Sequence, residues 1–327
     1  MSSHPQVSIV IPTRDRWRLL SAHALRSALG QVDVDMEVIV VDDGSTDETI
    51  EALARKSDAR LRVLRNERAP GPSGARNTGI AQARGAWLAF LDDDDLWSPM
   101  KIRTQLAEIG SEQWGFAGVI VVDDALDPLY MLPLPDSAGL VEALMLGNIV
   151  PGGSSNVIAE TGLVRELGGF DEQLSHSTDW DLWLRLARAG APAVSSQILV
   201  ATLEHARRMI FRDRSDVEAE SKHLFDKHGG ADRRQQLAVA EWVASEHRSA
   251  GHHLRAGMAY GRAGIRFRSP GNVAAALGAL FGEPGLRTVS RLLVRTRGAS
   301  HLEGDRRPVE VFPDWLQKYR TSSVSHA

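Results

Sequence analysis

Residues 86–97 read Ala-Trp-Leu-Ala-Phe-Leu-Asp-Asp-Asp-Asp-Leu-Trp, and this stretch decides the fold. An apolar run from Trp87 to Leu91 meets four consecutive aspartates, and the chain then becomes apolar again. The run is short and is bounded by Gly85 and by the acids, which predicts a buried strand rather than a helix. Open α/β sheets bind their ligands at the carboxyl ends of strands, so the acids after this strand mark a candidate site.

The four aspartates, Asp92 to Asp95, repel each other unless water or a cation screens their charges. Hard divalent cations such as Mg²⁺ and Mn²⁺ take oxygen ligands, typically one or two carboxylates together with substrate phosphates. The stretch therefore favours a metal–diphosphate site. The alternative is a solvated acidic turn, although the apolar residues on both sides argue against a freely exposed tip.

The composition is that of an ordinary soluble globular protein. Of the 327 residues 43% are hydrophobic and 24% are charged, and the net charge of −4 gives no indication of nucleic-acid binding. The chain has no cysteine, which excludes disulfides and thiolate chemistry and fits a reducing compartment. Neither a signal peptide nor a membrane-spanning apolar run is visible, so we expect a cytoplasmic protein.

Strands and helices alternate along the N-terminal part of the chain. The patterns predict strands at 7–11, 37–41 and 61–64, and helices at 16–29 and from about 48 to 57. This order is typical of a doubly wound α/β fold. Further along we expect a helix that follows the loop 71–77 and runs to about residue 84, helices at 99–112 and 179–189, and strands at 116–122, 129–132, 156–159 and 193–203.

The composition changes after about residue 206. Residues 207–265 have a helical pattern, and the segment from Gly251 to Ser300 holds eight arginines but a single acid, Glu283. We therefore divide the chain into an α/β domain over 1–206 and a helical C-terminal extension over 207–327, with a disordered tail from residue 320. Basic amphipathic helices of this kind suit an anionic membrane surface, and the alternative is a helical subdomain with a solvated arginine face.

Several spaced motifs occur in a fixed order between residues 7 and 205. They are Val7-Ser-Ile-Val-Ile-Pro-Thr13, Val38-Ile-Val-Val-Asp-Asp-Gly-Ser-Thr-Asp47, Gly74-Ala-Arg-Asn-Thr-Gly79, Phe90-Leu-Asp-Asp-Asp-Asp95, Gly168-Gly-Phe-Asp171 and Thr178-Asp-Trp-Asp-Leu182. This succession resembles the family 2 glycosyltransferases. The resemblance implies a GT-A fold, which is a Rossmann-like mixed sheet flanked by helices, and inverting transfer of a sugar from a nucleotide-diphosphate donor to a hydroxyl acceptor.

The resemblance also implies roles for individual residues. The nucleotide would be bound after the first and second strands and by the arginine of the Ala-Arg-Asn motif, which places Pro12, Thr13, Asp15, Asp42, Asp43 and Arg76 in the donor pocket. The family's Asp-x-Asp motif maps onto Asp92, Asp93 and Asp94, with Asp94 and Asp92 as the metal ligands. Four consecutive acids leave the register open, and Asp95 is the alternative to Asp94.

The chemistry of sugar transfer explains these residue types. A divalent Mn²⁺ or Mg²⁺ neutralises the charge that develops on the leaving diphosphate, and a carboxylate takes the proton of the attacking hydroxyl. The resemblance implies that Asp179 is this base, although the glutamate usual before it is Thr178 here. Asp181 ranks second. A histidine or arginine near residue 205 meets the diphosphate in many members of the family, which maps to His205 or Arg207.

Other functions are weighed against this one. A nucleotidyltransferase would need a glycine-rich loop after its first strand, but Pro12-Thr-Arg-Asp-Arg16 has no glycine there. A catalytically silent scaffold would have no need for the full set of acids. By analogy with the family we expect a role in polysaccharide, glycolipid or secondary glycan synthesis, whereas the sugar and the acceptor are not readable from the sequence.

Overall fold

The computed structural model describes residues 4–175, 177–204, 214–249, 251–297, 309 and 312–323. The chain divides into two compact units, which we describe separately. The first comprises Met1–Leu144, Ile149–Ala206 and Arg307–Ala327, and the second comprises Met145–Asn148 and Arg207–Arg306. The units differ from the division expected from the sequence in that the residues from 307 onward fall in the first unit.

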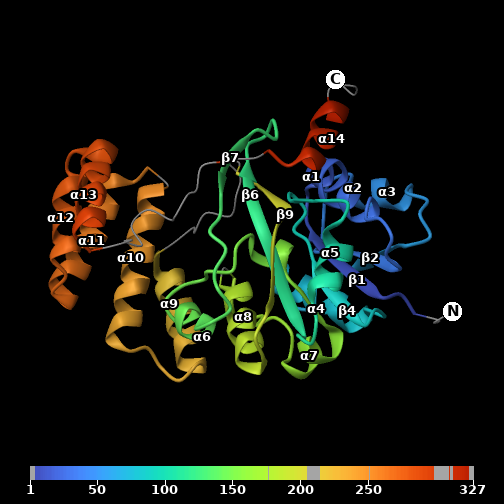
Figure 1. Ribbon diagram of the computed structural model, residues 1–327, viewed down its shortest axis with the longest axis horizontal. Coiled ribbons are helices and arrows are strands. Elements are labelled where there is room, and N and C mark those ends of the chain that lie inside the picture. Colours follow the sequence, from blue (N-terminus) through green and yellow to red (C-terminus); the bar gives the residue numbers. More distant parts are fainter. Residues whose placement is uncertain are drawn as a thin grey trace. The chain divides into compact units, whose positions relative to one another are not determined.

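Nine strands of the described residues form one mixed sheet in the first unit (Figure 1). Their order is β3-β2-β1-β4-β8-β6-β9-β5, and β7 pairs with β6 outside this order. The strands are β1 (Val7–Thr13), β2 (Met36–Asp42), β3 (Leu61–Arg65), β4 (Trp87–Phe90), β5 (Leu96–Trp97), β6 (Trp114–Val122), β7 (Pro128–Met131), β8 (Ile158–Glu160) and β9 (Ala193–Leu203).

Two kinds of strand pairing meet in this sheet. β1 runs parallel to both β2 and β4, and β2 runs parallel to β3. β8 is antiparallel to β4 and to β6, and β6 runs parallel to β9. Every residue of β1, β2 and β6 is buried, which explains why these strands are nearly continuous apolar runs in the sequence. The predicted α/β order of the N-terminal half is confirmed.

The helices of the first unit cover this sheet. They are α1 (Trp17–Ala22), α2 (Ala24–Leu29), α3 (Thr49–Ala54), α4 (Pro72–Gln82), α5 (Lys101–Glu108), α6 (Leu140–Leu144), α7 (Thr161–Glu166), α8 (Thr178–Ala189) and α14 (Asp314–Ser323). The single helix predicted over 16–29 is wrong, because His23 leaves the helical region (φ −114°, ψ −83°) and separates α1 from α2.

The strand predicted over 156–159 is displaced toward the C-terminus. Residues Gly153–Asn156 form the short 3₁₀ helix η1, and β8 begins only at Ile158. The reason is the buried Asn156 side chain, which bonds to the backbone N–H and C=O of Ala117 (2.9 and 2.7 Å) and to the C=O of Pro151. These hydrogen bonds hold η1 against β6.

Helix α14 packs on the sheet of the first unit, close to α1 and α2 (Figure 1). Leu316 and Tyr319 are buried in a cluster with Leu96 of β5 and with apolar residues of β6 and β9. The Tyr319 hydroxyl donates to the C=O of Trp97 (3.3 Å). The disorder predicted from residue 320 onward is therefore wrong for residues 320–323, and residues 324–327 lie outside the described residues.

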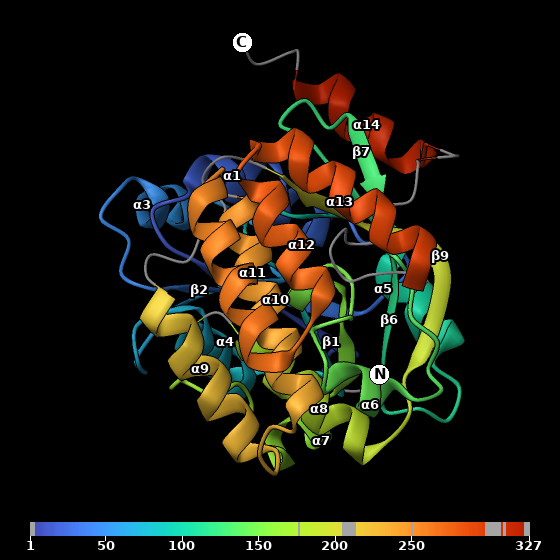
Figure 2. The ribbon, with the colours of Figure 1, turned by 90° about the vertical axis from the view of Figure 1, so that its left-hand side faces the viewer.

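The second unit is helical, and Figure 2 shows its helices α10 to α13 packed beside one another. Its helices are α9 (Arg214–Lys227), α10 (Arg233–Ser249), α11 (His253–Phe267), α12 (Pro270–Ala279) and α13 (Gly282–Arg297). Small side chains of α10 to α12 form most of its core around the buried Tyr260. None of the helices in the described parts of the chain combines the length and the apolar character needed to cross a membrane.

Candidate active site

The carboxyl ends of three parallel strands, β1, β2 and β4, lie next to one another at one edge of the sheet. β1 lies between the other two, and the three strands end at Thr13, Asp42 and Phe90. The acidic stretch follows β4 after one further buried residue, Leu91. The fold therefore brings the predicted nucleotide-binding residues and the acidic cluster to the same edge.

Arg16 lies against two of the acids. Its Nη1 atom is 2.8 Å from Oδ2 of Asp94 and 3.1 Å from Oδ1 of Asp93, and the Thr13 hydroxyl donates to Oδ2 of Asp93 (2.9 Å). Burial works against the charge on Arg16, but the two carboxylates outweigh burial and raise the pKa of its guanidinium. The arginine thus supplies the positive charge that a cluster of adjacent carboxylates requires.

The fold perturbs the ionisation of Asp93. Burial raises its pKa to about 7, and the neighbouring charge of Asp94 adds to this effect. Arg16 and the hydroxyl of Thr13 act in the opposite direction. Asp93 is thus a buried group, whereas the side chains of Asp94 and Asp92 are 16% and 36% exposed and can be reached by a ligand.

Asp92 pairs with the arginine of the Ala-Arg-Asn motif. Nη2 of Arg76 lies 2.5 Å from Oδ1 of Asp92, and the Phe170 ring lies 5.1 Å from the Arg76 guanidinium carbon. The Arg76 side chain is only 7% exposed, and its Nε atom has no hydrogen-bond partner among the described residues. A buried, unpaired donor of this kind is suited to donate a hydrogen bond to an anionic oxygen of a ligand.

Two distant motifs lock together through Asn77. Its side chain accepts the backbone N–H of Phe170 (2.8 Å) and donates to the C=O of the same residue (2.8 Å). Gly169 makes this contact possible, because its φ is +69° and a Cβ atom there would lie 2.4 Å from Oδ1 of Asn77. The Gly-Gly-Phe-Asp turn thereby holds Phe170 against Arg76.

The structure distinguishes Asp95 from its three neighbours. Asp95 is buried, and its carboxylate accepts hydrogen bonds from the Ser155 hydroxyl and from the backbone N–H of Leu203 (3.2 Å). The Ser155 hydroxyl in turn accepts the backbone N–H of Asp92 (3.0 Å). Asp95 thus ties the acidic stretch to η1 and β9, and this favours the register in which Asp94 is the ligand-facing acid.

Asp42 and Asp43, which were also predicted at the nucleotide site, accept hydrogen bonds from neighbouring loops. The Asp42 carboxylate accepts hydrogen bonds from the backbone N–H groups of Gly44 and Ser45. The Asp43 carboxylate accepts hydrogen bonds from the backbone N–H of Gly71 (2.8 Å) and from the side-chain amide of Asn66 (2.6 Å). These hydrogen bonds connect the loop after β2 to the start of α4.

Asp15 connects the loops after β1 and β2. It adopts a left-handed φ of +53° and accepts the backbone N–H of Thr46 (2.6 Å), which lowers its pKa. Pro12 is buried within β1 opposite Val41 of β2, so its contribution to the site is limited to the backbone.

Asp179 is the second residue of α8, the helix that packs against η1. Its Oδ1 accepts the backbone N–H of Trp180 (2.8 Å), and its Oδ2 lies 3.2 Å from the place where a Cβ of Gly153 would be. Gly153 is two residues before Ser155, which holds the acidic stretch. Trp180 is buried and donates its indole N–H to the C=O of Leu144, so it serves in packing rather than as an exposed stacking surface.

Asp181 has a different environment. It is fully buried and pairs with Arg185 one turn along α8 (Nε to Oδ2, 3.0 Å). Arg185 also donates to the C=O groups of Leu167 and Gly169 (2.6 and 2.7 Å). Asp181 thus orients an arginine that holds the Gly-Gly-Phe-Asp turn, which accounts for this acid structurally.

Arg16 and Ser155 were not predicted as site residues. The signal that could have found Arg16 is the need for a cation beside four carboxylates. His205 and Arg207 lie outside the described residues.

The acidic cluster agrees in kind with a divalent metal, because its carboxylates are the hard oxygen donors that Mg²⁺ and Mn²⁺ prefer. In the described parts of the chain no group of three or more histidine or acidic side chains is arranged as a complete metal site. Asp94 and Asp92 would therefore hold a metal together with oxygens of the substrate, as is usual for Mg²⁺.

Comparison with known families identifies the domain. Residues 8–138 match the model of glycosyl transferase family 2. This part of the chain is a family 2 glycosyltransferase domain. The match includes the ends of β1, β2 and β4 and therefore the whole acidic cluster.

Curated relatives of this domain come from bacteria. The chain is 43% identical over 123 residues to the succinoglycan biosynthesis protein ExoO of Rhizobium meliloti (38% of this chain, 34% of the relative). It is 40% identical over 101 residues to the Escherichia coli UDP-Glc:alpha-D-GlcNAc-diphosphoundecaprenol beta-1,3-glucosyltransferase WfgD (31% and 40%). It is 29% identical over 212 residues to the uncharacterized glycosyltransferase RP339 of Rickettsia prowazekii (62% and 65%). The chain thus spans between 34% and 65% of the lengths of these relatives.

Solved structures confirm the fold of the family 2 domain. TarS of S. aureus, residues 1–349 in complex with UDP-GlcNAc, superimposes with a TM-score of 0.59 at 18% identity, over 90% of this chain and 93% of that one. The mannosyltransferase PcManGT of Pyrobaculum calidifontis, in complex with GDP-Man and Mn²⁺, gives a TM-score of 0.50 at 19% identity, over 99% and 87%. The predicted GT-A type mixed sheet with flanking helices is confirmed.

Proposed function

We propose that this chain transfers a sugar from a nucleotide-diphosphate donor to an acceptor hydroxyl. The observation that carries the proposal is the pairing of Arg76 with Asp92 at the carboxyl edge of β1, β2 and β4 within a family 2 domain. Arg76 offers a buried, unpaired Nε donor beside carboxylates that can hold a cation. A diphosphate needs both of these groups, because it is anionic before the reaction and more so as it leaves.

A divalent cation supplies Lewis-acid neutralisation of the leaving diphosphate, and Asp94 with Asp92 would hold it. The Arg16 guanidinium bridges Asp93 and Asp94, so a cation held by Asp94 would take over part of the charge compensation that Arg16 provides. Thr13 and Asp93 remain as a buried support behind these ligands.

Asp179 is the base of the proposed reaction. It removes the proton from the acceptor hydroxyl while a new bond forms to the anomeric carbon and the bond to the diphosphate breaks. A base and a leaving group on opposite faces of the sugar make this a single displacement with inversion. The position of Asp179 beside Gly153, near the loop that holds the acidic stretch, supports this role.

Two other functions are less well supported. A nucleotidyltransferase would cradle phosphates in a glycine-rich loop after β1, but Pro12 to Arg16 contains no glycine and its Asp15 is used to bind the loop after β2. A silent scaffold would have no need for four consecutive acids beside a buried arginine, Arg76.

The acceptor class follows from the relatives. One is a succinoglycan biosynthesis protein, and another is a glucosyltransferase whose named substrate is a sugar diphosphoundecaprenol. We therefore assign the chain to polysaccharide or glycolipid synthesis. An acceptor of the second kind is embedded in a membrane, and contact with that membrane would fall to the basic C-terminal helices.

The test is donor turnover by the purified full-length protein with a panel of UDP-, GDP- and dTDP-sugars. Release of nucleoside diphosphate is measured with Mn²⁺ and with a chelator. One nucleotide class should be turned over with Mn²⁺ only, and Asp94→Asn should lower that rate at least 100-fold. The exposed acid Asp124, in the loop after β6, provides the control variant Asp124→Asn, which should keep the wild-type rate.

The outcomes separate the alternatives. Equal turnover in the chelator and in Asp94→Asn would remove the metal from the proposal but retain the transferase. No turnover and no binding of any donor would favour the silent scaffold.

A further inference from the structure

The second unit exposes an unusual number of large apolar side chains on two adjacent helices. We call this surface the apolar face. It comprises seven residues: Leu254, Met258 and Ile265 on α11, and Val273, Leu277, Leu280 and Phe281 on or just after α12. Their exposed fractions run from 43% for Val273 to 80% for Ile265. Isolated exposed apolar residues are normal, whereas a continuous patch indicates an interaction surface.

The residues of the apolar face lie on one side of the α11–α12 contact. The two helices pack in opposite directions, because Gly257 meets Ala279 while Gly264 meets Val273 at the other end. In each helix the apolar residues follow a spacing of three, four or seven, which places them in one stripe. In each helix the stripe lies about a quarter turn around the helix axis from the residues that contact the other helix, and it lies opposite the buried core residues. The two stripes therefore form one continuous surface.

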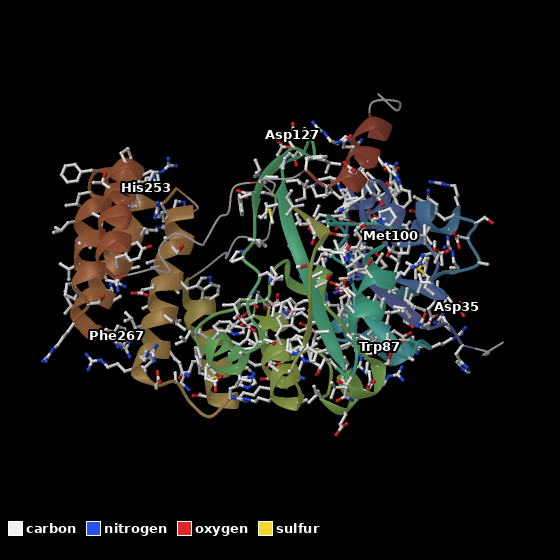
Figure 3. All side chains as sticks on the ribbon, in the orientation of Figure 1. Asp35, Trp87, Met100, Asp127, His253 and Phe267 are labelled. Carbon is white, nitrogen blue, oxygen red and sulfur yellow. The ribbon has the colours of Figure 1, made fainter. Side chains whose placement is uncertain are left out.

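The core of this unit does not need these side chains. Buried positions of α11 and α12 are mostly alanine, together with Tyr260, and they pack against α10 and α13. The exposed positions carry larger residues such as Ile265 and Phe281, which polar residues could replace without loss of packing. Figure 3 labels His253 and Phe267, which mark the two ends of α11 along which the first of the stripes runs.

The charged residues on α11 and at its end are all arginines, and α12 carries no charged residue. Arg255, Arg262, Arg266 and Arg268 are exposed on α11 or at its end, and the sequence from residue 251 to residue 282 contains no acid. The next acid, Glu283, is paired with Arg248 (2.6 Å) and Arg287 (3.0 Å). The surface thus combines apolar side chains with unopposed arginines, and it complements a surface that is anionic at its rim and apolar beneath.

We propose that the apolar face docks on an anionic lipid membrane. The seven apolar side chains would enter the boundary between headgroups and acyl chains, and the arginines would contact lipid phosphates at the rim. A pair of helices lying in the interface satisfies its own backbone hydrogen bonds, so no spanning segment is required. This inference rests on the second unit alone and does not depend on the sugar transfer proposed above.

The test is vesicle flotation with the full-length protein. Vesicles of pure phosphatidylcholine are compared with vesicles that also contain about one third phosphatidylglycerol, at low and at high salt. Wild type should float with the anionic vesicles only, and raising NaCl from about 0.1 to about 0.5 M should weaken binding because salt screens the arginines.

Matched variants separate the apolar and the basic contributions. Both Ile265→Ser/Phe281→Ser and Arg262→Gln/Arg266→Gln should bind anionic vesicles at least tenfold more weakly than wild type. The control Leu129→Ser alters an exposed apolar residue of β7 in the first unit and should bind as wild type does. Because every altered residue is exposed, the thermal unfolding temperature should stay within about 2 °C of wild type, which shows that each variant is folded.

Three results would overturn the proposal. One is equal binding to neutral and anionic vesicles, and another is wild-type binding by both double variants. The third is concentration-dependent self-association, measured by sedimentation without lipid, that Ile265→Ser/Phe281→Ser abolishes, because the apolar face would then be covered by a second copy of the chain.

Discussion

Two aspartates in the first turn of α8 illustrate how neighbouring acids take different roles. Asp181 is fully buried and is neutralised by Arg185, whereas Asp179 accepts the backbone N–H of Trp180 and lies beside Gly153. Asp181 orients Arg185 and through it the Gly-Gly-Phe-Asp turn, and Asp179 is the base of the proposed reaction. Residue type alone does not distinguish them.

The paired variants Asp179→Asn and Asp181→Asn test this difference. Asp179→Asn should lower donor turnover by about 10² to 10⁴, the usual contribution of a general base, and should leave stability unchanged. Asp181→Asn should reduce the free energy of unfolding by about 3 kcal/mol, because Arg185 then loses its buried counter-charge. Donor turnover and urea unfolding are measured on both variants. A loss of stability in Asp179→Asn together with a loss of turnover in a stable Asp181→Asn would contradict the assignment.

Lys101 is a buried lysine without an acidic partner among the described residues. It is fully buried at the start of α5, its Nζ lies 3.8 Å from the centre of the Trp97 ring, and Nζ has no hydrogen-bond partner among the described residues. Burial lowers its pKa well below the ordinary value. Between this lowered pKa and the ordinary lysine pKa of about 10.4, the folded state binds fewer protons than the unfolded state. The free energy of unfolding therefore rises with pH across this window.

Lys101→Met should raise the free energy of unfolding at pH 7 by about 1–3 kcal/mol, because it removes a buried polar group without a partner. The gain should shrink as pH approaches 10. Urea unfolding at several pH values measures both effects, and Lys56→Met, at an exposed lysine over the Trp17 ring, should stay within about 0.5 kcal/mol of wild type. A destabilised Lys101→Met would instead mean that the ammonium over Trp97 is a net stabilising contact.

At the scale of elements, α14 is part of the sheet domain rather than a loose tail. Leu316 is fully buried against residues of β5, β6 and β9, and the Trp315 indole N–H donates to the C=O of Ile198 (3.0 Å). Helix α14 closes the apolar surface beside Trp97, whose indole N–H bonds to the C=O of Ser155 (2.6 Å). It thereby supports the loop that holds Asp92 and Asp95.

Leu316→Ala should reduce the free energy of unfolding of the first unit by about 2–5 kcal/mol, as expected for truncating a buried leucine. The exposed Lys318→Ala, on the same helix, should change it by less than about 0.5 kcal/mol. Chemical denaturation followed by tryptophan fluorescence measures both. Equal stabilities of the two variants would show that α14 does not belong to this core.

The elements also show what sequence can and cannot predict. β1, β2 and β4 were predictable because buried strands must be continuous apolar runs, and the acids after β4 could only lie at its carboxyl end. The helix break at His23 could not be predicted, because no glycine or proline marks it. The packing of α14 could not be predicted either. Leu316 contacts the cluster that contains Leu96, which is more than two hundred residues away in the sequence, and no local pattern encodes this contact.

The same limit applies to the candidate site. Four identical aspartates cannot be ordered by sequence, because their roles depend on tertiary partners: Arg76 for Asp92, Arg16 for Asp94, and Ser155 with Leu203 for Asp95. Motif order was sufficient to predict that these acids belong together with Arg76, and the fold confirms that they share one edge of the sheet. The roles of the individual residues in binding and transfer stay predictions.

At the scale of the whole molecule, the two compact units divide two tasks. The first carries the family 2 domain and the proposed donor site, and the second carries the apolar face with its arginines. A variant of the apolar face should therefore keep turnover of a soluble donor while losing vesicle binding, whereas Asp94→Asn should do the reverse. The two activities are measured in separate assays, so failure of one proposal leaves the other open to its own test.

We propose that Arg76 and the acids after β4 bind the diphosphate of a nucleotide sugar. The most direct measurement is calorimetric titration of UDP, GDP and dTDP into the full-length protein with Mn²⁺, for wild type, Arg76→Gln and the exposed control Arg84→Gln. We predict that one nucleotide binds to wild type and to Arg84→Gln with the same affinity, and at least tenfold more weakly to Arg76→Gln, a loss of about 1.4 kcal/mol or more. Binding of no nucleotide, or equal binding by all three proteins, would contradict the claim.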